Sequence, residues 1–208
     1  MTIKDTFSDK AAGLHQKMTS TPTNKPLQVA GGEQLLNPAK IMAEIFKVEP
    51  GQHVADFGTG SMAYFALQAA KLAGNEGKVY AVDVIKHVLQ SAASQAKLSG
   101  LSNVIPVWSD LETIGAAKIP QASLDAVTIV NVLFQSKKPD LVLQEAHRLL
   151  KLGGRLLVID WKPGNISFAP QQRITKEAVK QAALSSGFVM DQEFDPGKYH
   201  WGMIFSKR

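Results

Sequence analysis

The chain has 208 residues, of which 45% are hydrophobic, so it can bury one substantial core and needs no second domain. It has no cysteine, which excludes disulfides, thiolate metal sites and a cysteine nucleophile. The net charge of +5 comes from scattered basic residues: residues 136–208 hold 12 Lys and Arg against 7 Asp and Glu, and residues 51–135 hold 5 against 6. A scattered excess favours a solvated surface over a nucleic-acid-binding face.

Residues 1 to about 30 are rich in Ser, Thr, Lys and Asn and are interrupted by Pro22 and Pro26. This composition predicts a flexible N-terminal arm or lid, followed by one domain over residues 31–208. No apolar run approaches the roughly 20 residues that span a bilayer, and the first residues lack the apolar stretch of a secretory signal. We therefore expect a cytoplasmic protein without a membrane span.

A helix is expected over residues 35–46, with Asn37 as its cap and Pro38 in its first turn. From residue 53 on, short apolar runs alternate with amphipathic stretches, which is the pattern of parallel strands linked by helices. The expected strands are 53–57, 78–83, 103–108, 124–130, 155–161, 189–194 and 198–205. The expected helices are 64–72, 85–98, 139–150 and 176–185, the third of them stopping at Gly153 and Gly154.

A turn at Asp195, Pro196 and Gly197 makes the last two strands antiparallel. The predicted fold class is therefore α/β, with a Rossmann-like, doubly wound, mostly parallel seven-stranded sheet and a C-terminal antiparallel strand pair.

The first strand runs into a Gly-x-Gly turn at Gly58 and Gly60, and a helix follows. The glycines allow a tight turn and let backbone N–H groups approach a ligand at the positive end of a helix. With Ala63 they also satisfy the dinucleotide fingerprint. Asp56 favours a cationic ligand instead, because a carboxylate there repels a pyrophosphate. S-adenosylmethionine carries a sulfonium and an ammonium, so it suits this acidic strand end.

Two more carboxylates follow the next two strands. Asp83 lies 23 residues after Gly60, where a carboxylate can accept hydrogen bonds from both ribose hydroxyls. Asp110 follows the third strand and is expected to face the same cleft, because ligands of open α/β sheets bind beyond the carboxyl ends of the strands. The alternative is that Asp56, Asp83 and Asp110 only cap helices or begin turns. Their position at three consecutive strand ends favours a cofactor site.

Five segments, VADFGTGSM, VYAVDV, SDLE, LDAVTIVNVLF and LLKLGGRLLVIDW, resemble successive motifs of class I S-adenosylmethionine-dependent methyltransferases. The resemblance covers about residues 30–208 and is closest to small, single-domain members related to quinone-biosynthesis and other small-molecule enzymes. It implies S-adenosyl-L-methionine as the cofactor. The cofactor-binding residues that it implies are Asp56, Gly58, Thr59 and Gly60 for the methionine moiety, Asp83 for the ribose, Asp110 and Leu111 for the adenine, and Asn131 and Val132 for the inner wall. Phe57, Met62 and Val84 are also expected to bind the cofactor.

One residue departs from the family pattern. The family often has a glycine at the position of Met62, so a larger side chain here narrows the cofactor pocket or packs beneath it.

Methyl transfer from a sulfonium is an in-line displacement with a good leaving group, so alignment and exclusion of water supply much of the rate and a general base is optional. The residues expected around the acceptor are Asn131, Phe134, Gln135, Asp160, Trp161, Tyr199, His200 and Trp201. Of these, Asn131, Tyr199 and His200 are the catalytic candidates. The unperturbed pKa of a histidine such as His200 suits proton removal at neutral pH. The alternative is that Tyr199 and His200 are ordinary strand residues. No metal site is expected, because the other histidines lack ligand spacing.

The loop over residues 162–173 either closes over the acceptor or is an ordinary surface connection. We expect a methyltransferase for a small-molecule acceptor. Three alternatives stay open. They are an RNA or protein methyltransferase that uses the basic C-terminal surface, a non-catalytic methyltransferase-fold protein with a binding or regulatory role, and, last, a nicotinamide-dependent reductase. Nucleic acid is therefore a less favoured partner, and the sequence does not determine the oligomeric state.

Overall fold

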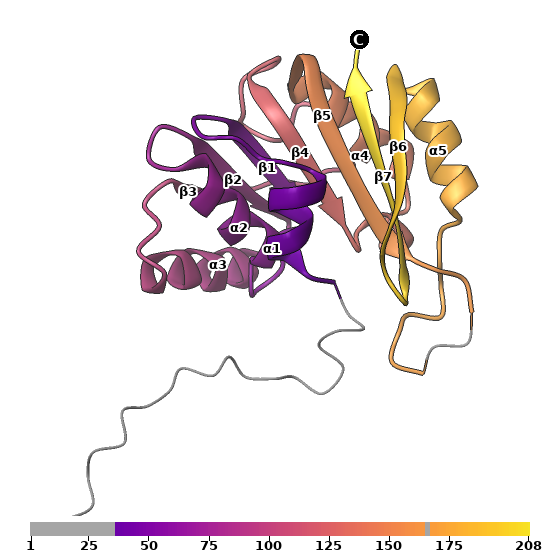
Figure 1. Ribbon diagram of the computed structural model, residues 1–208, viewed down its shortest axis with the longest axis horizontal. Helices are drawn as coiled ribbons and strands as arrows, with labels where there is room; N and C mark the ends of the chain where they lie inside the picture. The colour runs from indigo at the N-terminus through magenta and orange to yellow at the C-terminus, as the bar shows by residue number, and fades with distance from the viewer. Residues whose placement is uncertain (1–35, 165–166) are drawn as a thin grey trace, which may run out of the picture. The chain divides into compact units, whose positions relative to one another are not determined.

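The computed structural model describes residues 36–164 and 167–208, and the predicted arm at residues 1–30 lies outside this part of the chain. Its centre is a seven-stranded sheet in the order β3-β2-β1-β4-β5-β7-β6 (Figure 1). The strands are β1 (His53–Phe57), β2 (Lys78–Asp83), β3 (Val104–Trp108), β4 (Leu124–Val130), β5 (Leu150–Trp161), β6 (Phe188–Gly197) and β7 (His200–Lys207). The first five are parallel, and β7 is antiparallel to both β5 and β6, which confirms the predicted fold class.

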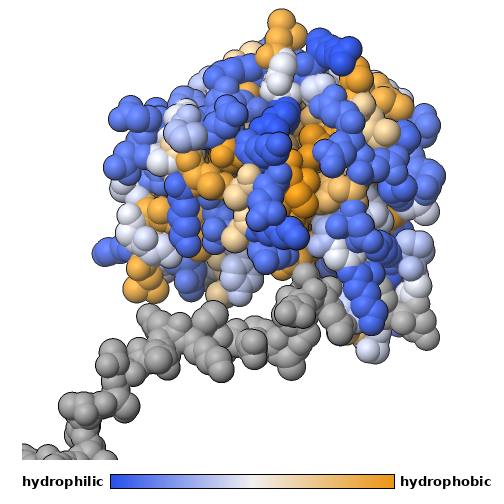
Figure 2. Space-filling model, in the orientation of Figure 1, coloured by the Kyte–Doolittle hydropathy of each residue, from blue (hydrophilic) through white to orange (hydrophobic). Residues whose placement is uncertain are grey.

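Helices cover both faces of the sheet. The helices α1 (Pro38–Lys40), α2 (Tyr64–Ala73) and α3 (Lys86–Leu98) pack on one face, and α4 (Pro139–Leu149) and α5 (Lys176–Ser185) pack on the other (Figure 1). Alternate strand residues enter the two cores, as Val54 and Ala55 do. Outside, polar side chains cover most of the face seen in Figure 2, with apolar patches between them. Within the described residues, no helix combines the length and apolar character needed to cross a membrane.

The first predicted helix forms, but only in part as an α-helix. The Asn37 side chain caps it by accepting a hydrogen bond from the Lys40 N–H at 3.0 Å, as expected. From Ile41 it continues as the π-helix η1 (Ile41–Ile45), in which the Phe46 N–H donates to the Ile41 carbonyl at 2.7 Å. Ile41 and Phe46 are buried in this widened turn, so packing against the sheet accompanies the irregularity.

Two predicted boundaries were wrong because strand pairing overrides local turn signals. The helix α4 ends at Leu149, and β5 starts at once, because buried Leu150 pairs with Leu124. Gly153 and Gly154 therefore lie in a bulge of β5 and do not stop the helix.

The second wrong boundary is the turn before β7. The strand β6 runs on to Gly197, which pairs with His200, so the turn consists of Lys198 and Tyr199 rather than of residues 195–197. The Asp195 carboxylate accepts from the Gly197 N–H at 3.0 Å and holds the bulge that precedes the turn.

One edge of the sheet collects the residues that the sequence singled out. Parallel pairing brings the carboxyl ends of β1 to β5 to this edge, at the bottom of the sheet in Figure 1. Because β7 runs the other way, its first residue, His200, pairs with Trp161 at the end of β5 and lies at the same edge. This is where ligands of open α/β sheets bind.

Candidate cofactor and acceptor site

The glycine loop after β1 is tied to the neighbouring strand, since the N–H groups of Gly58 and Thr59 both donate to the Val82 carbonyl, at 2.8 and 3.1 Å. Gly58 and Gly60 have left-handed φ values of 68° and 65°. A Cβ on Gly58 would lie 2.4 Å from Val132 Cγ2, whereas a Cβ on Gly60 would meet no atom of the described residues within 4 Å. Gly58 is thus required by packing, and Gly60 borders open space.

Asp56 anchors this loop from below. Its side chain is buried, with one oxygen accepting from the Thr59 hydroxyl at 2.9 Å and the other from the Thr128 hydroxyl at 2.6 Å. Thr128 is the residue of β4 that pairs with Asp56 in register. Burial raises the pKa of the Asp56 carboxyl to about 6, although both hydroxyl hydrogen bonds oppose this rise. Both oxygens are therefore engaged with the protein.

Asp83 closes the loop from the side. Its carboxylate accepts from the N–H groups of Gly60 at 3.3 Å and Ile85 at 3.0 Å. Each oxygen has a second lone pair, so the group can still accept from a ligand hydroxyl. The next residue, Val84, is 54% exposed and offers an apolar surface beside the carboxylate.

A neighbour of Asp83 that was not predicted as a site residue is Trp108, at the end of β3. Its indole N–H donates to the Val84 carbonyl at 2.8 Å, so it fixes the backbone beside Asp83. Asp110 makes a turn: its oxygens accept from the Glu112 N–H at 2.9 Å and the Thr113 hydroxyl at 3.3 Å. Leu111 packs into the core beneath. An aromatic residue at a strand end was the only available signal for Trp108.

The Met62 side chain is 44% exposed, so it does not pack beneath the loop, and narrowing of the cofactor pocket by this side chain stays a prediction. The left-handed residue that turns the chain into α2 is Ala63, with φ of 48°, and Met62 is not in that conformation. A side chain is tolerated at position 62 for this reason. The expectation that Met62 packs beneath the pocket was wrong.

Asn131 and Val132 follow β4, which lies between β1 and β5 in the sheet. Asn131 adopts a left-handed φ of 56°, and its N–H donates to the Ile159 carbonyl at 2.9 Å. Its Oδ1 is buried and has no hydrogen-bond partner among the described residues.

Two hydrogen bonds that the sequence did not predict hold the loop after Val132. Glu112 Oε1 accepts from the Ser136 hydroxyl at 2.8 Å and from the Lys137 N–H at 2.7 Å.

The ends of β5 and β7 carry two buried titratable groups. Asp160 accepts from the N–H groups of Phe134 at 3.1 Å and Trp161 at 2.8 Å, and burial raises the pKa of its carboxyl to about 6. Burial, together with the charge of Lys162, lowers the pKa of the His200 imidazole to about 4. His200 is therefore neutral at pH 7 and a weaker base than its ordinary pKa suggested.

The His200 ring stacks on Trp161, which belongs to a group of aromatic rings. Its ring centroid lies 4.2 Å from that of Trp161, and Tyr199 meets Phe168 edge-on at 5.0 Å. The Trp201 indole N–H donates to the Trp161 carbonyl at 3.0 Å, so Trp201 supports the strand and lies in the core of the other face. Across the described residues, no group of three or more His, Asp or Glu side chains is placed to hold a metal ion.

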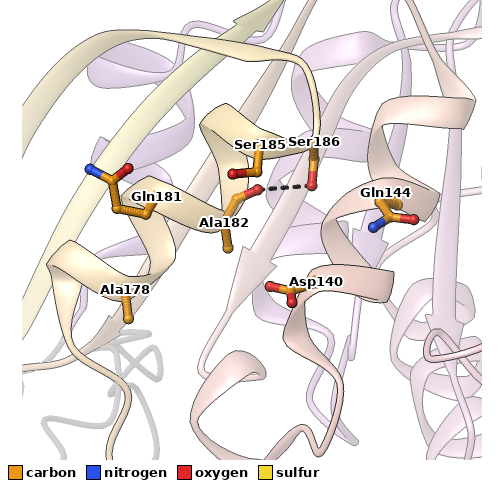
Figure 3. Close-up of a pocket in the computed structure, with 7 residues that line it drawn as sticks. All are labelled: Asp140, Gln144, Ala178, Gln181, Ala182, Ser185 and Ser186. Carbon is orange, nitrogen blue, oxygen red and sulfur yellow. Dashed lines mark hydrogen bonds between the residues drawn. The ribbon is translucent and has the colours of Figure 1, made fainter.

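A separate groove of about 330 Å³ lies between α4 and α5 (Figure 3). Its lining residues are Asp140, Gln144, Ala178, Gln181, Ala182, Ser185 and Ser186. The hydrogen bond drawn among them runs from the Ser186 hydroxyl to the Ala182 carbonyl at 2.8 Å. None of the site residues that the sequence predicted lines this groove.

Residues 35–202 match a protein-family model described as a methyltransferase domain. The chain belongs to this methyltransferase domain family. The match includes all the strand-end residues described above, and it confirms the family that the sequence motifs indicated.

Known methyltransferases resemble this family member in sequence and in structure. Ubiquinone/menaquinone biosynthesis C-methyltransferase UbiE of Teredinibacter turnerae is 32% identical over 130 residues, 61% of this chain and 50% of that protein. Protein-L-isoaspartate O-methyltransferase of Methanococcoides burtonii is 33% identical over 93 residues, 44% of this chain and 43% of that protein. A SAM dependent methyltransferase from Aquifex aeolicus superposes with a TM-score of 0.76 at 26% identity, covering 86% of this chain and 94% of that one. The chain spans about half the length of these two curated relatives.

S-adenosylmethionine is the cofactor of this methyltransferase domain, and the geometry fits it. The open side of Gly60 leaves room for a ligand against the backbone. The Asp83 carboxylate beside it suits hydroxyl donors, and exposed Val84 suits an apolar ring. The buried carboxyls of Asp56 and Asp83 suit a cationic ligand, as the sequence predicted for Asp56.

Proposed function

We propose that the protein transfers the methyl group of S-adenosylmethionine to a small-molecule acceptor at the sheet edge from β1 to β7. One observation carries the proposal. The space beside Gly60 is bordered by Asp83 on one side, and on the other Gly58 packs against Val132, the neighbour of Asn131. A ligand there would span from the carboxylate to the unpartnered Asn131 Oδ1.

In this proposal Asp83 accepts hydrogen bonds from the ribose hydroxyls, and Val84 with Leu111 contacts the adenine. Gly60 admits the methionine moiety beside the N-terminus of α2, where no side-chain cap is present among the described residues. The Ala66 N–H of this first turn already interacts with Asp56, which leaves the N–H groups of Tyr64 and Phe65 to face the carboxylate of the cofactor. Asp56 acts through Thr59: its buried carboxylate positions the loop and contributes negative charge beneath it. Asp110 shapes the adenine side through its turn.

Bound S-adenosylmethionine supplies an electrophilic methyl group whose leaving group is a neutral thioether. The residues of this chain then need to align the acceptor and keep water out. Asp160 contributes by holding the Phe134 N–H, which fixes the loop that carries Asn131. His200 and Trp161 border the acceptor from β7 and β5.

A small acceptor agrees with the burial of His200, which is 1% exposed and is not accessible to a large acceptor surface. The relatives include a C-methyltransferase of quinone biosynthesis and a protein O-methyltransferase, so a protein acceptor is the second candidate. Its support is the similarity to the isoaspartate enzyme over 44% of this chain.

Incubation of the full chain with methyl-labelled S-adenosylmethionine tests the proposal. The acceptor mixtures are a panel of small phenols, amines and carboxylic acids, an isoaspartyl peptide, and total RNA. We expect label in a small molecule. With S-adenosylmethionine below its Kd, Asp83→Ala should lower the transfer in line with a loss of roughly 1 to 3 kcal/mol of cofactor binding, whereas Asp191→Ala, a surface acid on β6, should not. Label confined to the peptide or the RNA would replace the proposal with a macromolecular acceptor. Cofactor binding without any transfer would favour the non-catalytic alternative.

A further inference from the structure

Four aromatic rings gather at the acceptor edge, and we call them the aromatic corner: Trp161, Phe168, Tyr199 and His200. The Trp161 and His200 rings lie 4.2 Å apart at an interplanar angle of 37°, and Phe168 lies 6.4 Å from Trp161 and 5.0 Å from Tyr199. They come from the end of β5, the loop after it, the β6–β7 turn and the start of β7. Segments distant in sequence thus converge on one aromatic cluster, in which His200 is buried and Phe168 is exposed.

The aromatic corner lies beside the cofactor site on the same edge. Trp161 pairs with His200 across β5 and β7, and the Asn131 N–H bonds to Ile159 of β5. Two strand spacings, about 10 Å, separate β5 from β1 and its glycine loop. A molecule bound at the corner is therefore within reach of a methyl group presented beside Asn131.

Buried polar atoms without partners are concentrated here. Nδ1 and Nε2 of His200, Nε1 of Trp161 and Oδ1 of Asn131 are all buried and lack a hydrogen-bond partner among the described residues. Such atoms are rare in folded proteins, because burying an unpaired donor or acceptor is costly. A ligand hydroxyl that pairs with Trp161 Nε1 and one nitrogen of His200 would satisfy two of these four atoms.

The chemistry of these atoms selects the ligand group. The indole N–H of Trp161 only donates, and a neutral imidazole such as that of His200 offers one donor and one acceptor. A hydroxyl group both accepts and donates, so it can pair with both side chains at once. The flanking rings favour a planar aromatic body by stacking and edge contacts.

The local charge disfavours a cationic acceptor. Lys198 lies 5.2 Å from the Tyr199 ring, and the described partners of the Arg173 guanidinium are the carbonyls of Pro170, Lys162 and Gly164. Lys162 is paired with Asp195 at 3.1 Å, and the remaining carboxyl, Asp160, is buried. The three cations Lys162, Arg173 and Lys198 thus exceed the two carboxylates Asp160 and Asp195 by one charge, and the charge of Arg173 acts on Asp160. This balance suits a neutral or anionic oxygen better than a cation.

We propose that the aromatic corner binds a planar aromatic acceptor with its hydroxyl between His200 and Trp161 Nε1, and that the methyl group goes to that oxygen. This inference rests on the proposed function. The C–S bond breaks with its electron pair left on sulfur, and the new O–C bond forms from an oxygen lone pair. The hydroxyl proton passes to the neutral imidazole of His200. This weak base is strong enough for the step, because the protonated ether formed by methylation is far more acidic than an imidazolium.

Binding of 2-naphthol, naphthalene and phenyltrimethylammonium to the full chain saturated with S-adenosylhomocysteine tests the inference, followed by product analysis with S-adenosylmethionine. We expect 2-naphthol to bind about tenfold more tightly than the other two. His200→Phe keeps a ring but removes both nitrogens, so it should lose the tenfold preference and the O-methylated product. Trp161→Phe removes only the indole N–H and should lose part of the preference.

The matched control is His147→Phe, because His147 also has a buried, unpartnered Nε2 and an edge contact to a ring, but on α4. It should retain the preference. An unchanged preference in both His200→Phe and Trp161→Phe, tightest binding of the cation, or a carbon-methylated product would each overturn the inference. Failure of the chain to bind S-adenosylhomocysteine would instead overturn the proposed function.

Discussion

Gly58 and Gly60 have nearly the same backbone conformation but different surroundings, and this difference allows a sharp prediction. An L-residue in the left-handed region costs about 1 to 2 kcal/mol at either position. At Gly58 the new Cβ also meets Val132 Cγ2 at 2.4 Å, and overpacking adds about 1 to 3 kcal/mol. Gly58→Ala should therefore lower the free energy of unfolding by about 2 to 5 kcal/mol, and Gly60→Ala by about 1 to 2 kcal/mol.

The cofactor affinities should follow the opposite order. The Cβ of Gly60→Ala projects into the space beside Asp83 where we place the cofactor, so binding of S-adenosylmethionine should weaken by about tenfold or more. Gly58→Ala, measured where it is still folded, should bind nearly as well as the wild type.

Urea denaturation and calorimetry on both variants provide the two readouts. Val132→Ala in the Gly58→Ala background should recover most of the packing loss, as a coupling of about 1 to 3 kcal/mol in a double-mutant cycle. Equal destabilisation by the two glycine substitutions, or the absence of coupling to Val132, would refute the assignment of Gly58 to packing and Gly60 to the ligand.

Three further predictions concern the acidic and imidazole groups. Asp83→Ala should weaken binding of S-adenosylmethionine by roughly 1 to 3 kcal/mol in a calorimetric titration, and unchanged affinity would contradict the ribose placement. Because the pKa of His200 is lowered from 6.5 to about 4, the wild type should lose up to about 3 kcal/mol of stability as the pH falls from 6.5 to 4. Urea denaturation of His200→Phe over the same pH range should not show this loss. The pKa of Asp56 is raised from 3.8 to about 6, so its contribution to stability is present below pH 3.8 and is lost as the pH rises to 6. Asp56→Asn should remove this pH-dependent loss in urea denaturation. An unchanged pH profile of the variant would show that Asp56 is not buried as described.

The strands and most helices followed from local patterns. The bounds of β1, β2, β4 and α5 agree with the predicted ones, because each has a clear apolar pattern between turn residues. The start of β5 could not be predicted, since it depends on the pairing of Leu150 with Leu124. The continuation of β6 to Gly197 likewise depends on its pairing with His200.

The candidate site was predictable as a set of strand ends but not as a set of roles. The sequence placed Asp56, Asp83 and Asn131 at one edge, and the structure brings them there. Only the folded chain reveals that both oxygens of Asp56 are used by Thr59 and Thr128, because Thr128 is distant in sequence. Burial also changes the chemistry of His200, and burial is a property of the packed edge that composition and spacing do not contain.

Calorimetric titration of the full chain with S-adenosylmethionine, S-adenosylhomocysteine and NAD tests the central claim, that the edge beside Gly60 and Asp83 holds the sulfonium cofactor. We predict binding of the first two, weakened in both cases by Gly60→Ala, and no binding of NAD. Binding of NAD in place of the other two, or no binding of any of the three, would contradict the account.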